Sequence, residues 1–104
     1  MPTLTTANLQ NLQRYVRELE VERGFEKQTI IQKCLLLGEE VGELFKAIRN
    51  AENLEIDKGS KVHEVADELA DILIYLCAIA NRTGIDLENA FREKEEINKK
   101  RVWN

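Results

Sequence analysis

The chain has 104 residues, of which 43% are hydrophobic and 33% charged, and a formal net charge of -4. A chain of this length forms one domain, residues 1–104, whose core is small enough that a partner subunit could be needed. The acidic balance, with a pI near 5.1, argues against a broad grip on DNA or RNA, which requires a basic face. One proline and five glycines fit a helical bundle better than a sandwich, a barrel or a disordered chain.

The sequence carries no sign of export or membrane insertion. Residues 1–6 lack the basic segment and apolar core of a signal peptide, so we expect a cytoplasmic protein. The longest stretch without a charge, residues 72–81, is about half the length that a helix needs to cross a bilayer, which indicates a buried helix. Cys34 and Cys77 lie in apolar helical sequence without a Cys/His cluster for zinc, and we interpret both as reduced thiols in the core.

Apolar residues recur at helical spacing in four segments, which predicts four helices and an all-α fold of the four-helix-bundle type. We expect the helices from Thr5 or Thr6 to Gly24, from about Gln28 to about Asn50, from Ser60 to about Thr83, and from Asp86 to about Lys100. Gly24 and Gly84 are natural helix ends. Ser60 and Asp86 are natural N-caps.

The second and third helices each carry an apolar stripe. On the second helix the stripe comprises Ile30, Cys34, Leu37, Val41, Leu44, Phe45 and Ile48. On the third helix it comprises Val62, Val65, Leu69, Ile72, Leu73, Leu76 and Ala80. Ile74 and Ala78 add apolar surface on the opposite side of the third helix, so we expect this helix at the centre of the bundle or at a subunit interface.

One pattern occurs on both of these helices. A shift of 28 residues places residues 37–45 over residues 65–73, and every position matches in type: apolar, small, acid, acid, apolar, small, acid, apolar, apolar. Glycine inside a helix costs about 1 kcal/mol relative to alanine, so Gly38 and Gly42 call for a reason. Close approach of another helix or access for a ligand would supply one.

The repeated acids are candidate metal ligands. At about 100° per residue, Glu40 and Glu43 lie roughly 60° apart on one side of their helix, and Glu68 and Asp71 hold the same positions on the other. If the two stripes share one core, the four carboxylates converge, and their mutual repulsion requires cations or protons. Hard oxygen ligands favour Mg²⁺, with Mn²⁺ as a substitute. The alternative is that these acids are the solvated faces of two amphipathic helices.

The fourth helix carries polar residues where its apolar stripe should continue. Lys94, Asn98 and Arg101 follow the face of Leu87 and Phe91. A lysine, an amide and an arginine on one face would suit the phosphates of a ligand. The alternative is a frayed helix end whose cations interact favourably with the helix dipole.

Several motifs together resemble a known family. Residues 39–43 and 68–71 resemble the E-E-x-x-E … E-x-x-D signature of the MazG-like all-α nucleoside triphosphate pyrophosphohydrolases, especially the small dCTP-pyrophosphatase branch. The tyrosine after the aspartate, within residues 71–76, and the K-x-x-x-N-x-x-R run at residues 94–101 are also similar to that branch. The resemblance covers roughly residues 9–103.

The resemblance implies Mg²⁺-dependent hydrolysis of a (deoxy)nucleoside triphosphate to the monophosphate and pyrophosphate, as house-cleaning of the nucleotide pool. It also implies a homodimer or homotetramer whose helices jointly build the site. Its implied metal ligands are Glu40, Glu43, Glu68 and Asp71, and its implied phosphate contacts are Lys94, Asn98 and Arg101. Glu39 and Asp67 are candidates to orient or deprotonate the attacking water.

The sequence does not predict which base such a site would prefer. Phe25, Tyr75 and Trp103 could stack on a base, and packing explains each of them equally well. Two other functions stay open: cleavage of phosphoribosyl-ATP by an enzyme of the same superfamily, and a noncatalytic helical interaction protein whose acidic face binds a basic partner.

Overall fold

The computed structural model describes residue 4, residues 8–53 and residues 64–102. Its elements are four α-helices: α1 (Leu9–Arg23), α2 (Ile30–Ala51), α3 (Val65–Thr83) and α4 (Leu87–Lys99). The described residues contain no strand, and the predicted all-α fold is confirmed. None of the described helices is long and apolar enough to cross a membrane.

Local capping explains where the first two helices begin and end. The Asn8 side chain accepts a hydrogen bond from the Asn11 backbone N–H at 2.7 Å, so α1 begins later than predicted; Thr5 and Thr6 lie outside the described residues. Gly24 ends α1 in the left-handed region, at φ 75°, as predicted.

The Thr29 side chain caps α2, and the Gln32 side chain accepts from the Thr29 backbone N–H, which completes a capping box. α3 begins at Val65, later than the predicted start, because Glu64 has an extended backbone (ψ 146°); Ser60 lies outside the described residues. Gly84 ends α3 at φ 69°, and the Asp86 side chain caps α4, both as predicted.

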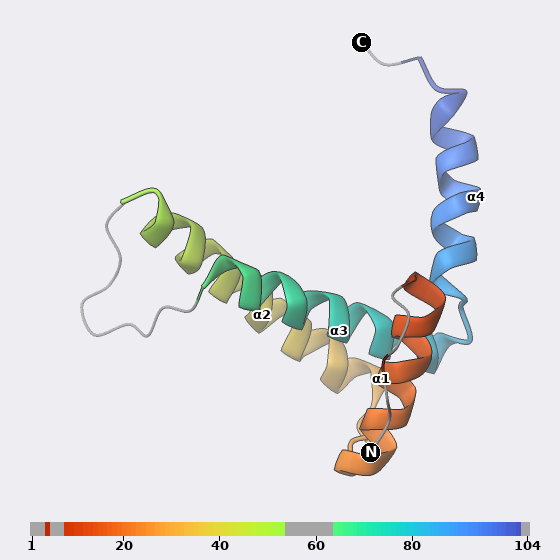
Figure 1. Ribbon diagram of the computed structural model, residues 1–104, viewed down its shortest axis with the longest axis horizontal. Helices are drawn as coiled ribbons and strands as arrows, with labels where there is room; N and C mark the ends of the chain where they lie inside the picture. Colours follow the sequence, from red (N-terminus) through yellow and green to blue (C-terminus); the bar gives the residue numbers. More distant parts are fainter. Residues whose placement is uncertain (1–3, 5–7, 54–63, 103–104) are drawn as a thin grey trace.

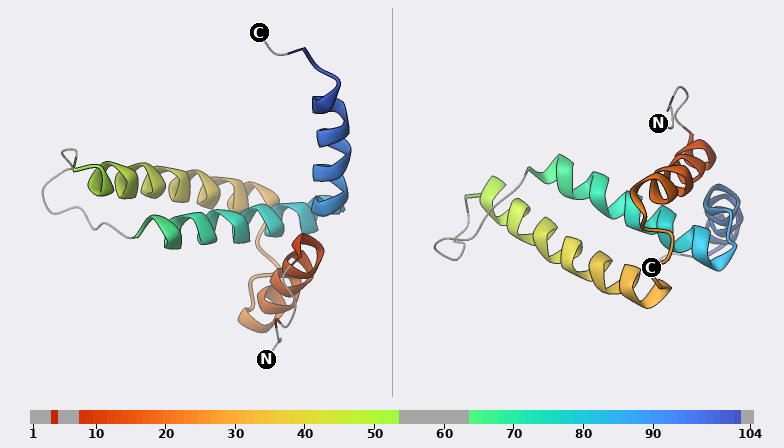
Figure 2. Two further views of the ribbon diagram at one scale, coloured as in Figure 1. Left: turned by 45° about the horizontal axis from the view of Figure 1, so that its top comes forward. Right: turned by 90° about the horizontal axis from the view of Figure 1, so that it is seen from below.

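α2 and α3 form an antiparallel hairpin, and α1 packs across the C-terminal part of α3, so that α3 is the central helix (Figures 1 and 2). α4 packs on α1 near its own beginning and then runs away from the hairpin (Figure 1).

Gln13 sets the direction in which α4 leaves. Its side-chain amide donates to Asn81 Oδ1 at 3.0 Å and to the Ile85 carbonyl at 2.7 Å, and its Oε1 accepts from the Leu87 N–H at 2.8 Å. These bonds tie α1, the end of α3 and the start of α4 together.

The buried apolar core lies between α1 and α3. Val16, Cys77 and Ala78 form its centre, with Leu87 of α4 packed against it. Cys77 is therefore a core thiol as predicted, whereas Cys34 is exposed on α2 and that prediction was wrong.

Much of the two predicted stripes lies on the outside of the hairpin. Phe45 is 62% exposed and Leu69 54% exposed. The reason is that α2 turns another side toward α3, the side on which Lys33 and Ala47 are buried. A Cβ added to Gly38 or Gly42 would meet nothing within 4 Å in the described part of the chain, so these glycines do not serve the α2–α3 approach.

Candidate metal centre

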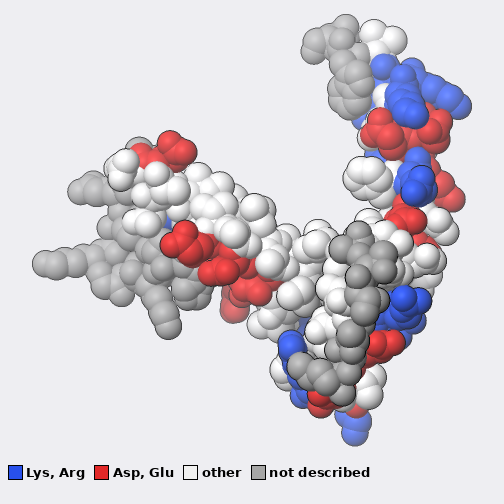
Figure 3. Space-filling view, viewed as in Figure 1, with Lys and Arg blue, Asp and Glu red and all other residues white. Residues whose placement is uncertain are grey.

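Three carboxylates converge in the α2–α3 interface. Glu40 comes from the middle of α2, and Glu68 and Asp71 come from the first half of α3. One carboxylate oxygen of each lies within 4.8 Å of the others. Glu68 is completely buried, and Glu40 and Asp71 are partly buried. Figure 3 shows acidic side chains gathered along the hairpin.

The electrostatics around Glu40 oppose the loss of its proton. A hydrogen bond with Glu68, followed by burial and by the negative charges of Asp71, Glu68 and Glu43, raises the pKa of Glu40 to about 7. All of these neighbours are carboxylates. A cation in the group would remove this repulsion, and three oxygen donors from carboxylates suit a hard divalent cation.

Glu43, the fourth predicted ligand, lies beside this group. It is partly buried, one helical turn beyond Glu40, and pairs with Lys46 at 3.7 Å. Its charge contributes to the raised pKa of Glu40, so the two carboxylates act on each other. The candidate site therefore consists of a close group, Glu40, Glu68 and Asp71, with Glu43 next to it.

The other predicted residues of α2 and α3 surround the group. Glu39 and Asp67 are exposed, each one residue before a member of the group and about 100° around its helix. Tyr75 is partly buried one turn after Asp71. Burial, followed by the charges of Glu40, Asp71 and Glu39, raises the pKa of Tyr75, which places its ring beside the carboxylates.

Within one chain, α4 does not reach the carboxylates. Lys94 is exposed on α4, which leads away from the hairpin (Figure 1), and Arg101 is exposed just after the end of that helix. Asn98 is partly buried, and its Oδ1 is buried without a hydrogen-bond partner in the part of the chain that the structure describes. Trp103 lies outside the described residues.

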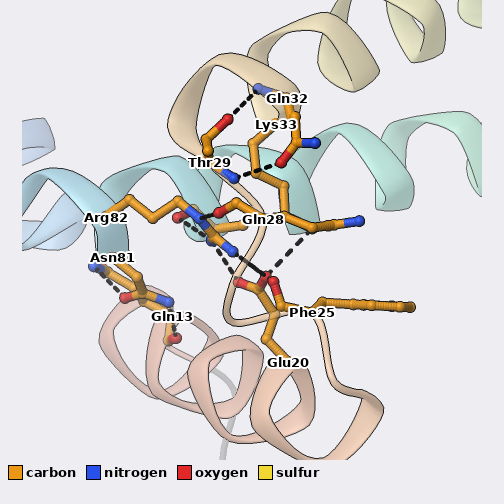
Figure 4. A network of polar contacts seen from close by, with 10 residues as sticks. Gln13, Glu20, Phe25, Gln28, Thr29, Gln32, Lys33, Asn81 and Arg82 are labelled. Carbon is orange, nitrogen blue, oxygen red and sulfur yellow. Dashed lines mark hydrogen bonds and ion pairs between the residues drawn. The ribbon is translucent and has the colours of Figure 1, made fainter.

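A second buried carboxylate lies where α1, α2 and α3 meet (Figure 4). The Arg82 guanidinium donates to both oxygens of Glu20, at 2.9 and 2.8 Å, and Lys33 Nζ lies 3.3 Å from Glu20 Oε2. Burial raises the pKa of Glu20, but hydrogen bonds and charges from Arg82 and Lys33 outweigh it and hold the pKa below its ordinary value. Glu20 and Lys33 are both buried. The three residues Glu20, Lys33 and Arg82 are called the ion-pair cluster below.

Arg82 also fixes the α1–α2 connection. It donates to the carbonyl oxygens of Gln28 at 2.8 Å, Phe25 at 3.0 Å and Ala78 at 3.0 Å. This cluster was not predicted from the sequence. The spacing of Lys33 could have indicated that it is buried, because it lies two turns before Glu40 and therefore on the same side of α2.

We compared the chain with known proteins. The sequence matches the MazG nucleotide pyrophosphohydrolase domain over residues 25–102. The chain belongs to the MazG nucleotide pyrophosphohydrolase family. A comparison with curated proteins gave no match.

Two crystal structures of iMazG from Vibrio DAT 722 are similar to this MazG-family chain. The Ntag form is 34% identical with a TM-score of 0.67, covering 89% of this chain and 95% of that one. The Ctag form is 33% identical with a TM-score of 0.65, covering 89% of this chain and 99% of that one. The MazG match contains every candidate carboxylate and the polar face of α4, whereas Glu20 precedes it.

Proposed function

We propose that this MazG-family protein hydrolyses (deoxy)nucleoside triphosphates to the monophosphate and pyrophosphate with Mg²⁺, or Mn²⁺ in its place, as a single-domain enzyme. The observation that carries the proposal is the convergence of Glu40, Glu68 and Asp71 inside the α2–α3 interface. Surplus or non-standard deoxynucleotides of the cytoplasmic pool are the proposed substrates, in a house-cleaning role that the family suggests.

Glu40, Glu68 and Asp71 would hold the ion, with Glu43 as a further ligand from the adjoining turn. Magnesium bound there would offset the charge of the triphosphate and acidify a water molecule. In the reaction the water oxygen forms a bond to the α-phosphorus while the bond from that phosphorus to the bridging oxygen breaks, which releases pyrophosphate. Glu39 and Asp67 are exposed beside the group, where either could orient this water or accept its proton.

We also propose that a second copy of the chain completes the site, as a homodimer or homotetramer. Lys94, Asn98 and Arg101 would contact phosphates, yet α4 and the residues that follow it lead away from the carboxylates of their own chain (Figure 1). A neighbouring copy could bring them to the metal centre.

The outer face of the hairpin supports assembly. Ile31, Leu35 and Phe45, which are 70%, 68% and 62% exposed, lie on one side of α2 with Gly38 and Gly42 between them. A contiguous apolar face of this kind marks an interaction site, and helical glycines let another backbone approach closely. On α4, Phe91 is 67% exposed and Ile97 56% exposed.

The activity is tested by incubating purified protein with the four standard dNTPs, dUTP and several oxidised or methylated nucleotides, with and without Mg²⁺, and measuring pyrophosphate. We expect release from at least one nucleotide only when Mg²⁺ or Mn²⁺ is present. Phosphoribosyl-ATP as a competitor separates the related activity. Absence of turnover across the panel would contradict the proposal.

Assembly is tested separately, by sedimentation of the Gly42→Arg variant against the wild type. The expected result is a smaller species that remains helical and has lost most turnover. An Arg14→Ala variant on the exposed side of α1 serves as control. If the wild type sediments as a monomer while it turns over a nucleotide, the second-copy proposal is wrong and the activity proposal stands.

A further inference from the structure

Lys33 lies at an unusual place for a lysine. It is only 4% exposed, and its ammonium group lies 3.3 Å from Glu20 Oε2, 5.3 Å from the centre of the Phe25 ring and 5.5 Å from the centre of the Tyr75 ring. These contacts join three parts of the chain: α1, the α1–α2 connection and α3. A lysine is strongly hydrated in water, so burying its charge is costly unless the site compensates.

Pairing with Glu20 does not by itself explain this lysine. Arg82 already donates to both oxygens of that carboxylate, so the ion-pair cluster holds two cations for one anion. A buried ion pair is often no more stabilising than apolar side chains of similar volume. Stability alone would therefore be served by an unbranched apolar residue at position 33.

Unlike its pairing with Glu20, which Arg82 shares, the contacts of Lys33 with two aromatic rings are its own. A cation over a ring face is attracted by the ring quadrupole, and the attraction grows when water is excluded. Phe25 is 41% exposed and lies in the α1–α2 connection, where its carbonyl oxygen accepts a hydrogen bond from Arg82. The Lys33 ammonium group over its face therefore favours the observed position of this ring.

The Tyr75 ring adjoins the candidate metal centre, and the Lys33 ammonium group lies over both this ring and that of Phe25. Tyr75 lies one turn after Asp71 and two turns after Glu68, so all three share one side of α3. Lys33 lies two turns before Glu40 on the matching side of α2. Along the hairpin the carboxylates therefore come first, and Lys33 and Tyr75 come next. The rings that Lys33 contacts form an aromatic wall beyond the carboxylates. A nucleotide whose phosphates bind at the carboxylates could place its base against this wall.

We propose that Lys33 is a positioning residue that holds the Phe25 and Tyr75 rings as the wall of the nucleoside end of the site. The inference rests on the proposed nucleotide hydrolysis and deepens it, because it assigns base discrimination to a buried cation that touches neither phosphate nor metal. Its effect should fall on KM and on the choice of base, not on the chemical step.

The test is steady-state kinetics of Lys33→Met on the four standard dNTPs. For the preferred nucleotide we expect KM to rise roughly tenfold with kcat within about twofold of the wild type. The spread of kcat/KM among the four nucleotides should narrow, while the rise in Tm caused by Mg²⁺ alone stays unchanged. Val16→Ala, which removes a buried core contact away from the rings, is the control that lowers Tm without changing KM.

A double-variant cycle with Phe25→Leu shows whether Lys33 acts through the ring. The two changes together should raise KM by clearly less than the product of their separate effects. If Lys33→Met fails to fold, Lys33→Gln replaces it and carries the same expectations, because it keeps a donor for Glu20 and removes the charge over the rings.

Unchanged KM and base discrimination in the Lys33 variant would overturn the inference. A KM of the double variant that rises by the full product of the two single effects would also overturn it. Those outcomes leave the proposed hydrolysis standing, because the wild type still turns over nucleotide. A wild type without turnover on any nucleotide overturns both.

Discussion

Two carboxylate groups differ in what surrounds them: one is Glu20 of α1, and the other comprises Glu40 of α2 with Glu68 and Asp71 of α3. Glu20 lies between Arg82 and Lys33, which hold its pKa below the ordinary value. Glu40 lies among other carboxylates, and its pKa is raised to about 7. The ion-pair cluster is complete in the folded chain, whereas the carboxylate group gains stability from a proton or a cation. The difference supports the proposal that a metal ion binds at the carboxylate group.

The largest expected effect concerns the chemistry of the carboxylate group. Asp71→Asn removes a candidate ligand, and because metal-assisted charge stabilisation is worth several kcal/mol, pyrophosphate release should fall roughly a thousandfold. The melting temperature without metal should stay equal or rise, since one repelling charge is lost. Glu18→Gln, an exposed acid on α1, is the matched control for both measurements. Loss of the fold in the Asp71 variant would contradict this description of the group.

The next effect concerns stability. Glu20→Gln leaves the buried Lys33 and the partly buried Arg82 without their anion, which should cost about 3 kcal/mol. For a domain of this size the melting temperature then falls by roughly 10–20 °C. Thermal unfolding followed by circular dichroism measures the change. A variant as stable as the wild type would show that the cluster does not need its acid.

A third prediction separates the two groups by metal alone. A ligand that binds only the folded state raises stability, by about 2.7 kcal/mol at a hundred times its dissociation constant. Mg²⁺ without nucleotide should therefore raise the melting temperature of the wild type and of Glu20→Gln, but not of Asp71→Asn. An equal rise in all three proteins would place the ion elsewhere.

The smallest effect is the dependence of stability on pH without metal. Because the pKa of Glu40 is raised, its contribution to the stability of the fold is fully present below about pH 4.5 and is lost as the pH rises through about 7. The lowered pKa of Glu20 acts oppositely, since its contribution is present above 4.5 and is lost as the pH falls through the folded-state value. The melting temperature of metal-free protein should fall by a few degrees between pH 5 and pH 7.5. Saturating Mg²⁺ should abolish that slope, and a slope that persists would contradict the account.

Local signals predicted much of the fold. The glycines at positions 24 and 84 end helices in the left-handed conformation, and Asp86 caps α4, because these depend on a few neighbouring residues. The start of α2 was also present in the sequence, as the Thr29 and Gln32 pair of a capping box, and was placed only approximately. The repeated acidic pattern predicted four converging carboxylates, of which Glu40, Glu68 and Asp71 lie together and Glu43 lies beside them.

The side of each helix that would be buried was harder to predict. An apolar stripe indicates that one side of a helix will be buried, but not whether it packs against the same chain or another one. Phe45 and Leu69 were assigned to a shared core and are exposed, since α2 and α3 meet through sides that contain Lys33 and Glu68 instead. The meeting of Glu20, Lys33 and Arg82 was not predicted, because a sequence does not show which cation will meet which acid.

The most direct test of the central claim is the binding of Mn²⁺ to nucleotide-free protein, measured by electron paramagnetic resonance of the free ion. The account predicts saturable binding to the wild type and to Glu18→Gln, and loss of that binding in Asp71→Asn while the variant remains folded. Binding that is absent from the wild type, or unchanged in Asp71→Asn, would contradict the claim that Glu40, Glu68 and Asp71 form a metal centre.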